Sequence, residues 1–298
     1  MNLSTVCRLW GENPEKIALL TDSCADLRPE YRDGKPIFMV PLKILCRDGE
    51  YADGVDISAA DIYARLGAGE LPKTSLPDGG SVEAVLDAIA AAGYEKVIAL
   101  HLSGGLSGTC NLVRVVAQGR EDLEVAVFDS ISGSLGIGMM LLQIWEDIRG
   151  GMGFRELCER RVPHLIAHTH PFFSVDTLEY LQKGGRIGKI TALAGTMLNI
   201  KPLVGFAPDG QLASVAKVRG RKAVQGKLVE LLERYASRPG RYNLAVANGG
   251  APEEMEALAG KVRERFPAYE HFWTGEMDAT LSVYIGSGVL GAAIQFLD

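Results

Sequence analysis

Two loops rich in hydroxyl side chains have the residue types and spacing best suited to binding a ligand. The first loop lies between a predicted strand and a predicted helix and holds Ser103, Gly104, Gly105, Ser107, Gly108 and Thr109. N–H groups at a helix start bind anions, and neighbouring hydroxyls complete the hydrogen bonds. The second loop carries Thr74 and Ser75 and is fixed by Pro77. The loops indicate an anion site or, equally, two structural turns.

Acidic residues follow two of the predicted strands. Asp22 and Ser23 end the run at 17–21, and Asp129 ends the run at 125–128. In an open parallel sheet the ligand crevice lies outside the carboxyl ends of the strands, so these three side chains are expected to converge there. A hydrolase or phosphotransferase that uses them is one hypothesis for the function. Asp26 lacks the spacing to Asp22 found in aspartyl-phosphate enzymes and is expected to cap a helix.

Other chemical motifs are incomplete. His164, His168 and His170 form an HxxxHxH pattern, but no Asp, Glu or Cys lies between them to complete a metal site, so we expect none. The five cysteines include no CxxC pair, which argues against a disulfide framework or a zinc module. The string GSGVLG at 286–291 matches GxGxxG, but the seven residues after it are too few for a dinucleotide fold.

Composition and charge bound the class of protein. The 298 residues predict two domains at about 150 residues each. The 31 basic and 37 acidic residues give a net charge of −6, which argues against global binding to nucleic acid or an anionic membrane. There is no stretch of about 20 apolar residues and no secretory signal pattern at the N-terminus, so we expect a cytoplasmic protein without a membrane span.

The pattern of apolar runs predicts two kinds of domain. In the first half, strands are predicted at 17–21, 97–102 and 125–128 and helices at 58–66, 81–92, 107–118 and 134–148. This alternation is typical of a mostly parallel α/β domain, which we assign to residues 1–168. In the second half, strands are predicted at 172–175, 201–206, 211–217, 243–247, 269–273 and 281–285 and helices at 221–235 and 252–266. These elements predict an α+β domain over residues 169–298.

Motifs along nearly the whole chain together resemble the DegV family. They are TDS at 21–23, ADL at 25–27, VPLK at 40–43, YADG at 51–54, KTS at 73–75 with Pro77, LSGGLSGT at 102–109, FDS at 128–130, VDTLEYL at 175–181, KGGRI at 183–187, LNIKP at 198–202 and KVRG at 217–220. The resemblance implies a two-domain fold related to dihydroxyacetone-kinase-type proteins, with a fatty acid between the domains. It also implies a subunit without catalysis of its own, which presents the carboxylate to a separate ATP-binding fatty-acid kinase and then carries the acyl phosphate.

Carried onto this sequence, the resemblance implies a carboxylate site made by Thr74, Ser75, Ser103, Ser107 and Gly108. The ligand implied is a long-chain fatty acid such as palmitate, stearate or oleate, with no cofactor. Gly104 and Leu76 stand where the family usually has Ser and Gln, and Tyr284 and Ser287 stand where it has His and Pro. Either Tyr284 donates in place of the histidine, or the head-group geometry, the chain preference or the ligand class differs.

Two further features bear on the ligand and on a partner. The uncharged segments at 134–145 and 190–198 are candidates for the lining of an acyl tail, or for plain core packing. Residues 183–227 contain nine basic residues and one acid, a local excess of eight. This excess predicts a surface that docks the kinase partner, with Arg219, Arg221 and Lys222 central, and the alternative is a solvated helix face.

Overall fold

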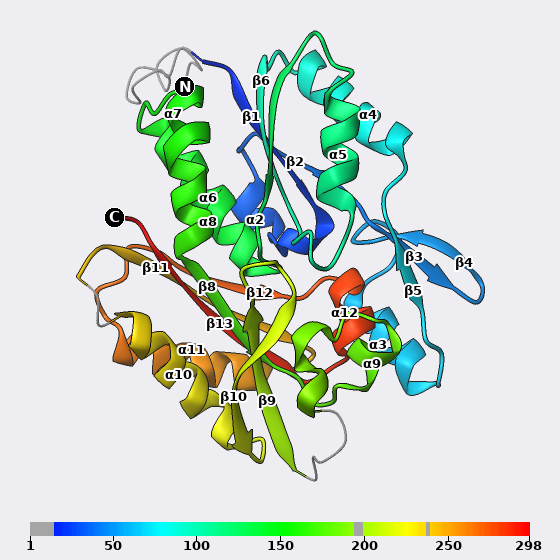
Figure 1. The fold of residues 1–298 in the computed structure, drawn as a ribbon, viewed down its shortest axis with the longest axis vertical. Coiled ribbons are helices and arrows are strands. Elements are labelled where there is room, and N and C mark those ends of the chain that lie inside the picture. Colours follow the sequence, from blue (N-terminus) through cyan, green and yellow to red (C-terminus); the bar gives the residue numbers. More distant parts are fainter. Residues whose placement is uncertain (1–14, 194–198, 237–238) are drawn as a thin grey trace, which may run out of the picture.

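A computed structural model of the protein describes residues 15–193, 199–236 and 239–298. Its strands form a four-stranded, a six-stranded and a three-stranded sheet, and helices pack between and around the two larger sheets (Figure 1). This arrangement confirms the predicted α/β class. In the view of Figure 1 the described chain begins at the upper left and ends farther down on the left.

The four-stranded sheet is parallel and comes from the first half of the chain. Its strands, in spatial order, are β2 (Ile37–Val40), β1 (Ile17–Asp22), β6 (Lys96–His101) and β7 (Glu124–Asp129). Side chains of a strand alternate between the two faces, so Leu20 packs with helices α4 (Gly79–Ala91) and α5 (Thr109–Ala117), while Leu19 packs with α6 (Leu135–Arg149). The predicted strands and helices of this half are confirmed.

Shorter helical segments complete this half. They are a 3-10 turn after β1 (η2, Ser23–Ala25), α2 (Pro29–Arg32), α7 (Phe154–Glu156), a π turn (Leu157–Arg161) and α8 (Val162–His168). A glycine-rich segment at 150–153 joins α6 to α7.

The six-stranded sheet comes from the second half and is mostly antiparallel. Its order is β10 (Leu212–Arg219), β9 (Ile200–Phe206), β8 (Thr169–Ser174), β13 (Val289–Phe296), β11 (Tyr242–Gly249) and β12 (Phe272–Glu276), with only β11 and β12 parallel. Helices α10 (Ala223–Ala236) and α11 (Pro252–Arg265) cover one face with leucines and valines. Helix α6 contacts β8, β11, β12 and β13 as well as β1 and β6, and therefore lies between the two large sheets.

The sequence patterns did not predict a small antiparallel sheet. It consists of β4 (Gly49–Ala52), β3 (Lys43–Cys46) and β5 (Lys73–Ser75). Helix α3 (Ala59–Gly67) lies between β4 and β5 in the chain. The strands of this sheet have three or four residues each, too short for a period of two to stand out. The Asp48–Gly49 pair, where the turn after β3 enters β4, is a recognisable hairpin signal that could have revealed it.

The predicted strand at 281–285 is wrong. These residues belong to helix α12 (Ala279–Ile285), whose N-cap Asp278 accepts a hydrogen bond from the Leu281 N–H at 2.7 Å. The strand that follows is β13, and Gly286 and Gly288 turn the chain into it with φ of 65° and 86°. Helix α12 packs against α3, so an element from the end of the chain lies on the first half. All strands of the four-stranded sheet lie before residue 169, and all strands of the six-stranded sheet lie after residue 168. The domain boundary at 168/169 stays a prediction.

Candidate functional site

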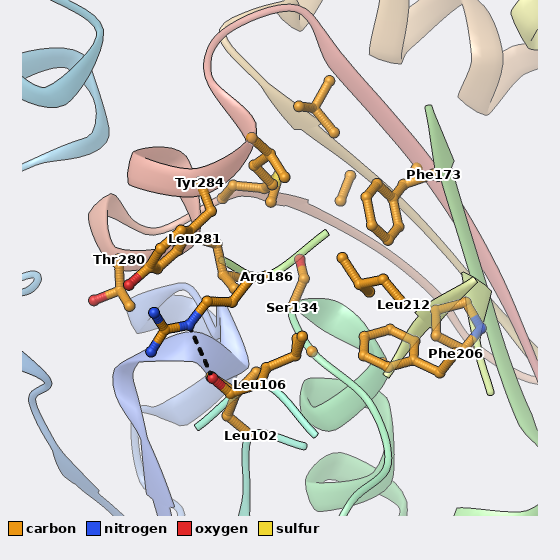
Figure 2. A pocket seen from close by; sticks show the side chains of 18 of the residues that line it. Leu102, Leu106, Ser134, Phe173, Arg186, Phe206, Leu212, Thr280, Leu281 and Tyr284 are labelled. Carbon is orange, nitrogen blue, oxygen red and sulfur yellow. Dashed lines mark hydrogen bonds between the residues drawn. The ribbon is translucent and has the colours of Figure 1, made fainter. Parts of the chain in front are cut away.

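An apolar cavity of about 300 Å³ lies between the two large sheets. Figure 2 shows Phe173 of β8, Phe206 of β9 and Leu212 of β10 on one side of it. The loop after β6, the start of α6 and helix α12 supply the rest of the wall, including Leu102, Leu106, Ser134, Leu135 and Leu281. Small residues of the sheet form another part of the wall, namely Ala245, Ala247, Gly291, Ala292 and Ala293. The cavity is at the lower end of the size range of small-molecule sites.

Polar side chains gather at one end of this cavity. The hydroxyl oxygens of Thr74 on β5 and Tyr284 on α12 lie 2.5 Å apart. The Arg186 guanidinium lies over the Tyr284 ring, 5.0 Å from its centroid, and donates to the carbonyls of Leu106 and Gly184 at 3.4 and 2.8 Å (Figure 2). Among the described residues that line the cavity, Arg186 alone is charged. This end of the cavity therefore suits a single anionic group.

The start of α5 faces the same cavity. Ser107 and the N-cap residue Gly108 both line it, and the Ser107 hydroxyl lies 2.9 Å from that of Thr109. A side chain at Gly108 would meet Leu76, which also lines the cavity. The Thr109 N–H donates to the Ser107 hydroxyl at 3.3 Å, and the N–H groups that follow it in the first turn of α5 add to the donors for an anion. Ser75 lines the cavity beside Thr74, so the structure brings together five of the six predicted carboxylate ligands: Thr74, Ser75, Ser107, Gly108 and Tyr284.

Ser103 is not among the residues that line the cavity. Its side chain is fully buried, and its hydroxyl donates to the Gly210 carbonyl at 2.8 Å. The contact holds the loop after β6 against the turn between β9 and β10. The sequence placed Ser103 at the anion site because the residue precedes a helix, but a distant turn occupies its hydroxyl instead.

We expect Gly105→Ala to destabilise the protein by about 1–3 kcal/mol, because a Cβ at Gly105 would lie 2.3 Å from the backbone of Gly210 and neither backbone can give way. Gly226→Ala is the matched control: it lies inside α10 with nothing within 4 Å of an added Cβ, and it should stabilise by up to about 1 kcal/mol. Urea unfolding of both variants checks this. Equal midpoints for both variants would contradict the close packing of the two loops.

The acids and the serine of the predicted enzyme crevice have structural partners. The buried Asp22 carboxylate accepts from the N–H groups of Cys24 and Leu102 at 3.1 and 2.8 Å, and lies 3.0 Å from Nδ1 of His101. Asp129 accepts from the N–H groups of two loop residues, and the Ser23 hydroxyl accepts from a third. None of the three lines the cavity described above. They fix the loops at the strand ends, which in turn shape the cavity.

Two residues of the polar end were not predicted from the sequence as site residues. Arg186 was counted only among basic surface residues, although it stands in the KGGRI string. Thr280 falls just before the strand predicted at 281–285 and was given no role; it lies on α12, is 2% exposed, and lines the cavity with a hydroxyl that has no hydrogen-bond partner among the described residues. A correct prediction of α12 would have placed Thr280 and Tyr284 one turn apart on one helix face.

The histidine pattern packs as aromatic rings. The rings of His164 and His168 stack with centroids 4.2 Å apart, and that of His170 lies against Tyr235. Burial, then the neighbouring His168, lowers the pKa of His164. Within the part of the chain that the structure describes, no group of ligand atoms close enough to share one metal ion includes these histidines.

The predicted acyl lining at 134–145 contributes only its beginning. Ser134, Leu135 and Gly136 line the cavity, whereas the later residues of α6 lie in the core between the sheets. Of the second predicted lining, Ile190 is buried in the core beside the cavity, and positions 194–198 lie outside the described residues.

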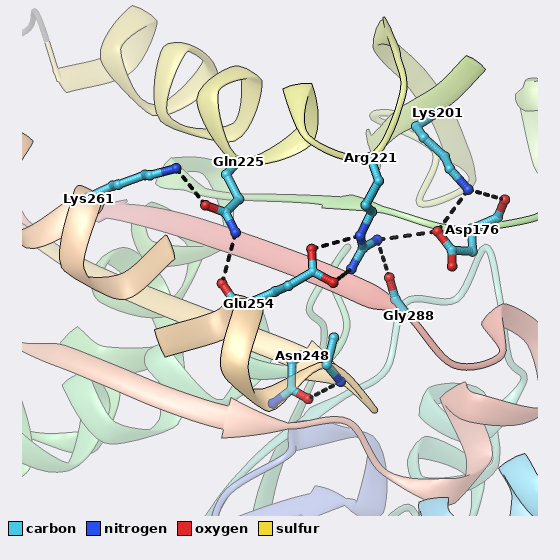
Figure 3. Close-up of polar contacts among 9 residues, drawn as sticks. Asp176, Lys201, Arg221, Gln225, Asn248, Glu254, Lys261 and Gly288 are labelled. Atoms are coloured by element: carbon cyan, nitrogen blue, oxygen red, sulfur yellow. Dashed lines mark hydrogen bonds and ion pairs between the residues drawn. The ribbon is translucent and has the colours of Figure 1, made fainter. Parts of the chain in front are cut away.

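The predicted docking residues divide into one internal anchor and two exposed cations. Arg221 donates to the Glu254 carboxylate at 2.9 Å, to Asp176 at 3.4 Å and to the Gly288 carbonyl (Figure 3). Arg219 and Lys222 on either side of it are exposed. Other basic residues of the segment also pair with acids, namely Lys183, Lys189, Lys201 and Lys227. Apart from Asp209, the partner of Lys189, these acids lie outside 183–227 and therefore reduce the local excess of positive charge.

Comparison with known proteins decides the family. The family model described as "Uncharacterised protein, DegV family" matches residues 16–296. The chain belongs to the DegV family. A DegV domain-containing protein of Clostridium acetobutylicum is 35% identical over 280 residues, which are 94% of this chain and 99% of that protein.

Solved DegV structures share the whole fold. A DegV family protein from Thermus thermophilus, described with fatty-acid binding, matches with a TM-score of 0.89 at 29% identity and covers 95% of this chain and all of its own. DegV from Bacillus subtilis, described as a fatty acid binding protein, matches with a TM-score of 0.85 at 28% identity over 95% of this chain and 99% of its own. These likenesses confirm the two-sheet DegV fold. No helix in the described residues is long and apolar enough to cross a bilayer.

Proposed function

We propose that this DegV protein binds a long-chain fatty acid, such as palmitate, stearate or oleate, in the cavity between its sheets. The observation that carries the proposal is the layout of the cavity: apolar walls, with Arg186 as the one cation among the described lining residues and the Thr74–Tyr284 hydroxyl pair at one end. The solved DegV proteins from Thermus thermophilus and Bacillus subtilis, which share this fold, are described as binding fatty acids.

The energetics of the cavity fit such a ligand. Each buried methylene stabilises the complex by about 0.8 kcal/mol, so the tail supplies most of the affinity. A buried carboxylate needs a positive charge and hydrogen-bond donors to offset its desolvation. Arg186, the hydroxyls of Thr74, Thr280 and Tyr284, and the amides at the start of α5 supply them. Tyr284 thus provides the donor that the family's histidine would supply.

Competition between palmitate and its methyl ester tests this assignment. The protein is loaded with a fluorescent fatty acid, and each compound is titrated in to displace it. We expect palmitate to compete far better than the ester, because the ester lacks the charge that Arg186 meets. Equal competition would contradict a carboxylate at the polar end, and no competition by either would contradict the fatty-acid site itself.

We also propose that the protein is a binding subunit for an ATP-binding fatty-acid kinase, without catalysis of its own. The acids and the serine that an independent hydrolase or phosphotransferase would use, Asp22, Ser23 and Asp129, are engaged in loop contacts away from the cavity. The exposed Arg219 and Lys222 support a docking surface, and Arg221 holds the backbone between them in place.

Reversing two exposed charges tests the docking surface. Arg219→Glu with Lys222→Glu should weaken capture of the ATP-binding kinase subunit about tenfold and make the remaining binding less salt-sensitive, because attraction becomes repulsion at the edge of an interface. Fatty-acid affinity should stay unchanged. Arg155→Glu, at a position 87% exposed on α7, is the control. Unaltered partner capture and acyl-phosphate formation by the double variant would rule out this surface.

A further inference from the structure

Two acidic residues from opposite halves of the chain lie together beside the cavity, the buried Asp26 and the half-buried Asp278. Asp26 follows the turn after β1, and Asp278 is the N-cap of α12. One oxygen of Asp26 accepts from the Asp278 N–H at 2.9 Å, and the other accepts from the Ser134 hydroxyl. Oδ1 of Asp278 accepts from the Leu281 N–H. The two carboxyl groups therefore join the start of α6 to the start of α12.

The remaining oxygen of this pair lacks a donor. Oδ2 of Asp278 is buried and has no hydrogen-bond partner among the described residues. A buried, ionised carboxylate with an unsatisfied oxygen is costly. Burial raises the pKa of Asp26 to about 7, and burial, followed by the charge of Asp26, raises the pKa of Asp278 well above its usual range. A proton on one of the two groups supplies the missing donor to the other.

The groups that face the pair from neighbouring elements are acidic or neutral. Asp53, from the loop after β4, accepts from the N–H groups of Ala279 and Thr280 at 3.0 and 3.2 Å. Cys24 on η2 is buried, and burial raises its pKa. Tyr63 on α3 bonds the Ser282 hydroxyl at 2.9 Å, and burial raises its pKa to about 12. Glu276 and Asp22 add negative charge nearby. A proton bound to the pair would therefore reduce the negative charge of this cluster.

The residues tied by the pair are parts of the cavity wall. Ser134, which bonds Asp26, lines the cavity, and so do Thr280 and Leu281 directly after Asp278. Loss of the proton would leave two negative charges near each other at the junction of α6 and α12. Repulsion would then loosen the wall that carries Thr280 and Tyr284.

We propose that Asp26 and Asp278 share one proton and act as positioning residues for α12, so that loss of this proton speeds release of the bound acyl chain. The part about release rests on the proposed fatty-acid function; the shared proton does not. Because the folded chain keeps a proton that an unfolded aspartate loses near pH 4, the contribution of the pair to stability is full below about pH 4 and is lost as the pH rises through about 7.

Asp278→Asn tests the proposal, since Asn also caps helices and its amide donates permanently to Asp26. The release rate of bound palmitate is measured from about pH 6 to about pH 8, on either side of the pKa of Asp26. We expect the wild-type rate to rise about tenfold and the Asp278→Asn rate to stay nearly level. Asp33→Asn, at an exposed position, is the control and should follow the wild type. Parallel wild-type and Asp278→Asn profiles would overturn the proposal.

Infrared difference spectra of the ligand-free protein test the proton without any fatty acid. The C=O stretching band of a buried, protonated carboxyl should be present in the wild type at about pH 6 and absent from Asp278→Asn. A wild-type spectrum without this band would overturn the shared proton. A protein that shows the band but takes up no palmitate would contradict the proposed function and leave the shared proton standing.

Discussion

Removing both hydroxyls of the polar end, in the variant Thr74→Val with Tyr284→Phe, is expected to weaken palmitate binding about 100-fold. Each hydrogen bond to a charged group contributes about 1.5–3 kcal/mol, so two of them at the lower end give about 3 kcal/mol. Both replacements keep the shape of the side chain, and Phe keeps the ring over which Arg186 lies. The loss should therefore come from the carboxylate contacts and not from altered packing.

The matching long-chain alcohol provides the control for this variant. Hexadecanol has the same tail as palmitate and no negative charge, so its affinity should differ between wild type and variant by much less than that of palmitate. Isothermal titration of wild type and variant with both ligands distinguishes a loss of carboxylate contacts from damage to the tail site. Equal affinity of the two proteins for palmitate would place the carboxylate elsewhere, whereas equal losses for palmitate and hexadecanol would indicate damage to the tail site.

A large side chain among the small residues of the cavity wall should change the acyl-chain length that the protein prefers. Ala247 on β11 lines the cavity, next to Leu135 and Ala293 in the core. The ring of Ala247→Phe would occupy space used by about three or four methylenes, which at about 0.8 kcal/mol each amounts to about a 100-fold loss for palmitate. Acids short enough to end before the ring should bind as before, so octanoate is expected to bind wild type and variant alike.

An equally large substitution away from the cavity separates this effect from general destabilisation. Ala91→Phe, at an exposed position of α4, should leave the whole chain-length series unchanged. Competition assays with saturated acids of increasing length check both variants. An unchanged profile for Ala247→Phe would mean that the acyl tail does not reach β11.

Much of the sheet framework could be predicted because its strands are long apolar runs. All six residues of β1 are buried, and such a run in an α/β pattern is hard to mistake. The error at α12 has an equally physical cause. Residues 279–285 form a helix of two turns in which Thr280, Ser282 and Tyr284 alternate with apolar residues, and over so short a run this alternation matches the period of two of a strand. The N-cap Asp278 was the signal available.

The site was less predictable than the fold, because its parts come from distant segments. Thr74 and Tyr284 are 210 positions apart in the chain, and their hydroxyls meet only because α12 packs back onto α3 and β5. The family resemblance pointed to both residues, but it also pointed to Ser103, whose hydroxyl is engaged by a turn 107 positions later. The anchoring of Arg221 by Glu254 likewise depends on a contact between α10 and α11 that local sequence does not encode.

Native mass spectrometry of the purified protein, followed by denaturation and lipid extraction, is the most direct test of whether this protein binds a fatty acid. We predict a mass increment on the folded protein that disappears on unfolding and resolves into a free fatty acid with a long acyl chain. If the protein carries no lipid and takes up no added fatty acid of any length, the proposed fatty-acid binding is contradicted.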